Sequence, residues 1–245
     1  LTYQPDQDVY AWTRASTRGH YKSTASVREG DFDVVYMLVE RVIDGNTVTF
    51  LERLDERQFE ELSDAFFVDA GLTLDVPIAI TGMTAADPVV VTAVGHGFTD
   101  GDVVDISGVQ EASTETNTGD ALSIDYNGTG FVVANATADT FEIQLEGSGY
   151  DGSTFAAYSA HGEGRKAVTT ISGLWHLEGA PVVVAANGYV EENLVVTDGA
   201  ITLQSPASRV HIGLPYFSRL ITLPLTTYAD GGRTSEGRVK NISRL

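Results

Sequence analysis

Residues Pro181–Leu203, PVVVAANGYVEENLVVTDGAITL, carry the clearest fold signal in this chain of 245 residues. Short apolar runs alternate with Asn187-Gly188 and Asp198-Gly199, and such dipeptides favour the tight turns of β-hairpins. Strand-like runs recur on both sides of this stretch with a spacing of about 8–12 residues, which is typical of a β-sandwich or barrel. We therefore predict a mostly-β protein whose main domain is sandwich-like or barrel-like.

A second hairpin is predicted nearer the N-terminus. Val34–Val42 and Thr47–Glu52 are β-rich, and Asp44-Gly45-Asn46 between them tolerates the positive φ angles of a tight turn. The following stretch, Leu51–Leu62 (LERLDERQFEEL), has apolar residues at helical spacing. It fits a short helix, and it equally fits the end of a strand followed by a charged loop.

The middle of the chain differs from both flanks in charge. Residues 79–165 contain 13 acidic residues and 1 basic residue, a net charge of −12 (1 − 13). Its apolar runs predict short strands at Pro88–Val94, Val103–Ile106, Gly130–Ala134 and Thr140–Leu145, with the polar stretch Gln110–Asp120 as a loop.

Two similar phrases flank this acidic segment: AITGM at 79–83 and TISGL at 170–174. A domain inserted into a surface loop leaves such a pattern, because insertions are tolerated where the chain ends lie close together. We predict that residues 79–165 form a small, inserted all-β domain. Residues 1–78 and 166–245 then form a discontinuous β host domain, and two tandem domains are the alternative.

Composition excludes several classes of protein. The chain has 15 Lys and Arg against 34 Asp and Glu, a net charge of −19, and it has no cysteine. Disulfide scaffolds, cysteine nucleophiles and thiolate metal sites are therefore excluded. No apolar run approaches the length of about 18 residues that a membrane-spanning helix needs. Because residue 1 is Leu, we expect the chain to be a fragment of a longer protein.

The charge also bears on nucleic-acid binding. A strongly acidic surface repels phosphate, so the middle segment is not expected to bind duplex DNA tightly. Residues 205–245 have 6 basic and 2 acidic residues, a net charge of +4 (6 − 2), but no recognition motif. A solvated surface with a basic strand is the favoured interpretation of that tail.

No motif in the sequence predicts a catalytic, cofactor or metal site. The five histidines lie in no HExxH motif and in no i, i+4 ligand pair, and they are His20, His96, His161, His176 and His211. Neither a GxSxG nucleophile elbow nor a phosphate-binding GxxxxGK[ST] loop is present. Asp100, Asp102 and Asp105 have the oxygen ligands that Ca²⁺ prefers, but their spacing matches no known calcium loop. We expect turn or packing roles for His96 and His176.

Aromatic residues leave one binding function open. Tyr10, Trp12, Tyr189, Tyr216 and Phe217 would suit a sugar-stacking platform, or the core or a subunit interface, and we favour the second role. A carbohydrate-binding or adhesin module is the alternative function. It requires Trp12, Trp175, Tyr189 or Tyr216 to be exposed on one face. A polysaccharide-degrading enzyme is a further alternative, and it requires two carboxylates in a cleft.

Several phrases in fixed order carry a resemblance to a known family. They are Ala11-Trp12-Thr13-Arg14, Asp33–Arg41 (DVVYMLVER), Asn46–Asp55 (NTVTFLERLD), Asp64–Leu72 (DAFFVDAGL), Thr170–Pro181 (TISGLWHLEGAP), Val182–Gly188 (VVVAANG) and Ala200–Leu214 (AITLQSPASRVHIGL). Together these phrases resemble the C-terminal half of phage tail nozzle proteins, also called tail tubular protein B or stabilization proteins of short-tailed phages. The resemblance covers residues 1–78 and 168–245.

The acidic segment resembles a different family. Its phrases are Val91-Thr92, His96-Gly97-Phe98, Gly101-Asp102, Ile106–Val109, Tyr126-Asn127-Gly128, Phe131-Val132-Val133, Thr140–Ile143 and Gly149-Tyr150. They are similar to the small β-domain named after the first catalytic cysteine half-domain of ubiquitin-activating enzymes, from which the long polar stretch Glu111–Asp125 departs. The name implies no catalysis here, because the chain has no cysteine.

The nozzle resemblance implies a structural role in the virion tail. Nozzle proteins form a ring, usually hexameric, below the portal and adaptor, hold tail fibres or spikes, and let DNA pass through a central channel. We therefore expect a homo-oligomer that is not an enzyme, has no cofactor and contacts adaptor, portal and tail fibre proteins. Part of the acidic charge would face the channel or the outer surface of the virion. The apolar stretches Pro181–Ala185 and Leu214–Leu225 would supply core or interface.

Overall fold

The computed structural model describes residues 15–55, 59, 61–112 and 125–217, and the backbone alone of 2–4, 9–11, 121–122, 228–229 and 233–234. It is mostly β, with 57% of the described residues in strands. The described residues form no α-helix, only the short 3-10 helices η2 (Leu62–Asp64) and η3 (Trp175–Leu177). The chain divides into two compact units, residues 1–215 and 216–245.

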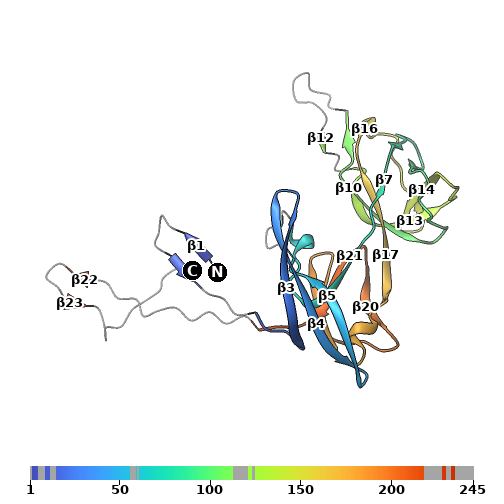
Figure 1. The fold of residues 1–245 in the computed structure, drawn as a ribbon. Helices are drawn as coiled ribbons and strands as arrows, with labels where there is room; N and C mark the ends of the chain where they lie inside the picture. Colours follow the sequence, from blue (N-terminus) through green and yellow to red (C-terminus); the bar gives the residue numbers. More distant parts are fainter. Residues whose placement is uncertain are drawn as a thin grey trace. The chain divides into compact units, whose positions relative to one another are not determined.

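The strands are named in chain order in Figure 1. They are β1 (Thr2–Gln4), β2 (Val9–Ala11), β3 (His20–Glu29), β4 (Phe32–Ile43), β5 (Asn46–Arg53), β6 (Asp69–Asp75), β7 (Ile78–Ala79), β8 (Gly82–Met83), β9 (Val90–Thr92), β10 (Val103–Ser107), β11 (Gln110–Glu111), β12 (Ala121–Leu122), β13 (Gly128–Ala134), β14 (Thr140–Leu145), β15 (Ser148–Gly149), β16 (Tyr158–Ala160), β17 (Glu163–Ser172), β18 (Pro181–Ala186), β19 (Tyr189–Val195), β20 (Ala200–Ala207), β21 (Arg209–Leu214), β22 (Tyr228–Ala229) and β23 (Arg233–Thr234).

Of the second unit, the structure describes Tyr216, Phe217 and the backbone of two short strands. β22 pairs antiparallel with β23, with Tyr228 opposite Thr234. Most of the predicted apolar stretch Leu214–Leu225 lies outside the described residues.

The acidic segment has a hydrophobic core of its own. Strands β10, β13, β14, β9 and β8 pair in that order as an antiparallel sheet. Their inward side chains form a cluster that runs from Ile80 to Ile143. Tyr126, Phe141 and Ile143 are its largest fully buried members. The alternation of buried and partly buried residues in β14 is the pattern of a strand with one face on a core.

A second core lies in the C-terminal part of the first unit. Strands β19, β18, β21 and β6 pair antiparallel as a four-stranded sheet. Leu174, Leu177, Val184 and Ile212 are among the buried residues of this cluster, which runs from Ile171 to Leu214. The predicted hairpin at Asn187-Gly188 is confirmed, because Ala186 pairs with Tyr189 and Asn187 has the positive φ of 48° that this turn requires.

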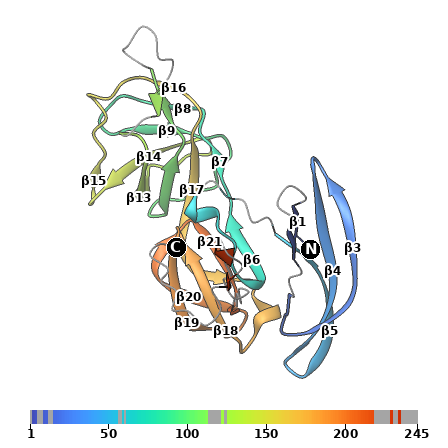
Figure 2. The same ribbon diagram turned by 90° about the vertical axis from the view of Figure 1, so that its left-hand side faces the viewer.

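One strand, β17, links the sheet of the first core to β20, whose Ile201, Leu203 and Ala207 belong to the second core. Its first half pairs with β10, with Val103 opposite Ala167, and its second half pairs with β20, with Val168 opposite Ala207. Figures 1 and 2 show this strand continuing without a break. The predicted boundary at residues 165 and 166 therefore falls inside a strand. Two separate cores agree with an inserted domain, whose independence stays a prediction.

The predicted N-terminal hairpin is also confirmed. β4 and β5 pair from Tyr36 opposite Arg53 to Ile43 opposite Asn46. Asp44 and Gly45 both have positive φ, 46° and 75°, as a type I′ turn requires. The strand-end interpretation of Leu51–Leu62 fits the structure, since β5 ends at Arg53 and a single 3-10 turn begins at Leu62. The helix alternative is wrong for the described part of that stretch.

We predict that the two cores unfold separately if residues 79–165 are an independent domain. Ile143→Ala removes a fully buried side chain of the first core, and Ile212→Ala does the same in the second. Each should lower the free energy of unfolding of its own core by about 2–5 kcal/mol. Differential scanning calorimetry should then show two transitions, with each substitution shifting a different one. A single transition that both substitutions shift equally would contradict the domain prediction.

Candidate functional site

The three-stranded sheet β3–β4–β5 is the least buried part of the first unit that the structure describes. Every residue of β3 is exposed. In strands, alternate side chains point to opposite faces, so the register separates two faces. Tyr21, Val39, Arg41 and Phe50 share one, here called the inner face.

The opposite side, here called the outer face, carries exposed apolar side chains. Phe32 is 60% exposed, Val42 71% and Leu51 67%, and Val27 and Leu38 are exposed to a lesser degree. Leu38 and Leu51 lie directly opposite each other in the β4–β5 register. Apolar area of this kind on the surface of a soluble protein typically marks an interaction site.

Arg41 links the inner face of the sheet to Thr17, Arg18 and the start of β6. It is 3% exposed, and its guanidinium donates two hydrogen bonds of 2.8 Å to the carboxylate of Glu52. It also donates to the carbonyl of Arg18 and the hydroxyl of Thr17, and lies 3.6 Å from Asp69 at the start of β6. Burial alone lowers the pKa of Arg41, but the bonds to Glu52 and the charge of Asp69 outweigh it, so the pKa is raised.

A second arginine network lies at the junction of the two cores. Arg165 of β17 donates a hydrogen bond of 2.7 Å to Asp75 of β6, and another to Glu163. Arg209 of β21 lies 3.3 Å from the other oxygen of Asp75 and also pairs with Asp64. Planar guanidinium groups bind carboxylates in this way when both must be partly buried. This network therefore links β6, β17 and β21 and has a structural role.

The three aspartates considered for Ca²⁺ are separately engaged by protein donors. Asp100 accepts a hydrogen bond from the backbone N–H of Ala136, at 2.8 Å. Asp102 accepts one from the N–H of Thr99 and pairs with Lys166 at 2.7 Å. Asp105 accepts bonds from Gly130, Asn187 and Ser208. Among the residues described, no group of three or more His, Cys, Asp or Glu could hold a metal ion.

The described histidine contacts are structural. His96 accepts the backbone N–H of Phe98 on Nδ1 at 2.9 Å, and its ring lies against Phe98 and Phe141. This is the turn role expected for it. His176 bonds the carbonyl of Ala70 through Nε2, and His211 bonds Thr73 and the carbonyl of Ser63. His20 and His161 are exposed.

The two candidate aromatic rings that the structure describes in the first unit, those of Trp175 and Tyr189, lie near opposite ends of β19. Trp175 is 65% exposed and its ring lies against Gly199, where an added Cβ would come within 2.5 Å of it. Tyr189 is also exposed, at the opposite end of β19 from the turn that contains Gly199. A seven-residue strand separates the two rings by roughly 20 Å. Tyr216 and Phe217 are exposed as well, whereas the side chains of Tyr10 and Trp12 lie outside the described residues.

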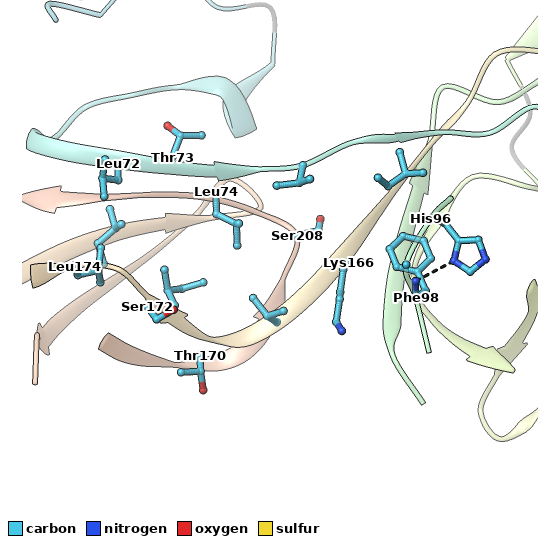
Figure 3. A pocket seen from close by; sticks show the side chains of 16 residues that line it. Leu72, Thr73, Leu74, His96, Phe98, Lys166, Thr170, Ser172, Leu174 and Ser208 are labelled. Atoms are coloured by element: carbon cyan, nitrogen blue, oxygen red, sulfur yellow. Dashed lines mark hydrogen bonds between the residues drawn. The ribbon is translucent and has the colours of Figure 1, made fainter. Parts of the chain in front are cut away.

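A pocket of about 500 Å³ opens between β6, β17 and the turn at Gly97 and Phe98. Figure 3 shows its walls, with Leu72 and Leu74 on one side and Thr170 and Ser172 on the other. Its volume lies in the range of small-molecule sites. However, Lys166 is already paired with Asp102, and the Ser208 hydroxyl donates to Asp105. No Asp or Glu lines this pocket, so it lacks the carboxylate pair that the polysaccharide-degrading alternative requires.

No protein-family model matches this chain, and no curated protein matches it. No helix in the described part of the chain is long and apolar enough to cross a membrane. The function therefore has to be inferred from the sequence and the structure of this chain. Its unusual features are an exposed apolar sheet face and buried arginines that fasten the sheet behind it, an arrangement suited to binding another protein surface.

We predict that Arg41 is essential to the position of the β3–β4–β5 sheet. Arg41→Leu leaves the carboxylates of Glu52 and Asp69 without their cation, and it should lower the free energy of unfolding by about 3 kcal/mol. Urea denaturation measures the loss, and hydrogen exchange should rise first in β4 and β5. Arg53→Leu is the control, since Arg53 is more than a third exposed and its ion pairs should contribute less than about 1 kcal/mol. Equal losses for both variants would contradict this role.

We also predict a pH-dependent contribution from Asp102. Burial raises the pKa of Asp102, but Lys166 and Thr99 lower it more, so the pKa falls below its ordinary value of 3.8. The stability that Asp102 adds is therefore complete well above pH 3.8 and disappears as the pH falls through the lowered pKa. Asp102→Asn should be less stable than the parent at pH 6, with a difference that shrinks below pH 3.8. Urea denaturation at both pH values measures it, and a constant difference would contradict the assignment.

Proposed function

We propose that this chain is a structural, non-enzymatic component of a short phage tail. In this proposal it forms part of a ring-shaped nozzle that attaches below the portal and adaptor proteins, holds tail fibres and lets DNA pass. The site of action would be the virion tail. The proposal joins the order of sequence phrases that resemble nozzle proteins to the surface of the β3–β4–β5 sheet.

The exposed outer face is the observation that carries the proposal. Small sheets are marginally stable in water unless an apolar face packs against something. Here the inner face is fastened through Arg41, while Phe32, Val42 and Leu51 of the outer face remain exposed. A protein that works by assembly would cover such a face with a neighbouring subunit.

The charge of the chain is compatible with a channel that DNA traverses. Phosphates are repelled by an acidic wall, and residues 79–165 have a net charge of −12 (1 − 13). A tube that released DNA during infection would need such a weakly binding lining.

A carbohydrate-binding module is the second candidate, favoured by one observation. Trp175 has one side of its ring against Gly199 and is 65% exposed, which is how an aromatic ring would be presented to a sugar. The separation of Trp175 from Tyr189 argues against a multi-ring platform. A glycan array with the parent protein and with Trp175→Ala tests this candidate directly.

We predict that the protein assembles into closed rings at micromolar concentration. Negative-stain electron microscopy and mass photometry should show one ring size with a central opening. A protein that remains monomeric in both measurements at high micromolar concentration would contradict the proposal.

The same sample should bind duplex DNA only weakly. Its electrophoretic mobility shift should be absent at 150 mM salt, because an acidic lining has few cations to replace the counterions of DNA. Tight DNA binding that falls steeply with salt would contradict a channel role even if rings form.

A further inference from the structure

We propose that the outer face of the β3–β4–β5 sheet is a subunit interface, covered head to tail by a second copy of this chain. The inference rests on the proposed function, because it assigns one surface to the contact between ring neighbours. The outer face of one copy is covered by a different surface of the neighbouring copy.

The outer face has the apolar content of an interface core. Val27 lies opposite Val34, and Leu38 lies opposite Leu51, so two cross-strand apolar pairs lie on one face, with Tyr36 between them along β4. Phe32 continues this row at the start of β4, and Val42 lies near its end. Val34, near the start of β4, is the one residue of this row that is already buried, at 5% exposed.

The charged side chains of the outer face are paired with one another or with the adjoining Asp55. Lys22 pairs with Glu40 at 3.1 Å, and Arg53 pairs with Glu29 at 3.4 Å. Tyr36, on the same face, donates a further hydrogen bond to Glu29. Arg53 also pairs with Asp55 at 3.0 Å, so two cations meet three carboxylates and the paired groups have a net charge of only −1 (2 − 3).

The low net charge of the outer face indicates which kind of partner it can bind. The whole chain has a net charge of −19, so most surfaces of two copies repel each other. An apolar face with internally paired charges is one that can approach an acidic copy without such repulsion. A strongly basic partner would instead be expected to meet an acidic face.

The geometry favours a head-to-tail contact over a face-to-face pair. Closed rings of more than two subunits require heterologous contacts, in which two different surfaces meet. Three strands spaced about 4.8 Å apart and about 33 Å long give a face of roughly 450 Å². A standard interface buries about 800 Å² on each partner, so this face supplies about half of one. Ring closure would supply the remaining affinity.

The experiment compares single aspartate substitutions in the full chain. Leu51→Asp places a charge in the outer face, and the exposure of Leu51 should leave the fold intact. Val94→Asp is the matched control, since Val94 is a similarly exposed residue of the acidic segment, at 70%. Sedimentation velocity over a concentration series should show at least a tenfold weaker self-association for Leu51→Asp and less than a twofold change for Val94→Asp. Circular dichroism and the melting temperature verify folding of both variants.

A mixing experiment tests the head-to-tail arrangement. Leu51→Asp keeps the surface that receives the outer face of a neighbour, so fluorescently labelled variant should still bind the parent protein and end its assembly as short oligomers. Failure of the labelled variant to bind the parent would overturn the head-to-tail assignment. Rings that form normally with Leu51→Asp would overturn this inference while leaving the proposed function intact. Absence of rings in the parent protein would overturn the proposed function, and this interface with it.

Discussion

The backbone pairing of β17 is the constraint on which the first unit depends. A single ten-residue strand completes the sheet of the acidic segment through β10 and then pairs with β20 next to the second core. Without this strand, β10 and β20 would each lose a paired neighbour, and each unpaired buried backbone group would carry a penalty of about 1–3 kcal/mol. Arg165 lies within the same strand and ties it to Asp75 of β6. The two cores therefore share both a strand and the polar network beside it.

Sequence patterns located the strands that have one clear face. β14 and β18 match their predicted ranges, because Thr140–Leu145 and Pro181–Ala186 are apolar runs bounded by turn residues. β3 was missed, since HYKSTASVRE has few apolar residues and all of them are exposed. β11 lies at the start of Gln110–Asp120, which was predicted as a loop, because a two-residue pairing leaves no periodic signal. The apolar spacing of Leu51–Leu62 fitted both a helix and a strand end, and the described residues show β5 ending at Arg53.

The candidate interface could be anticipated only in part. Residues 34–39, VVYMLV, are apolar at consecutive positions, which is typical of a strand covered on both faces. The register was needed to show that Val39 and Arg41 face inward and that Leu38 and Val42 face outward. The same holds for Arg41: nothing near it in the sequence indicates that Glu52 and Asp69 would surround it. Long-range pairing places these residues together, and spacing along the chain does not encode it.

Acidity and the apolar face have complementary consequences for assembly. Exposed sheets are prone to uncontrolled pairing, and natural proteins limit this with charge and twist. A net charge of −19 keeps most encounters between copies repulsive, while the internal ion pairs of Lys22 and Arg53 remove that repulsion at one face. In the proposed assembly, the attraction is confined to this face and the repulsion acts over the rest of the surface, so contact through this face would be favoured over other approaches. The specificity of the contact between copies would then have two sources. One is the contacts of the outer face, and the other is the repulsion between the acidic surfaces elsewhere.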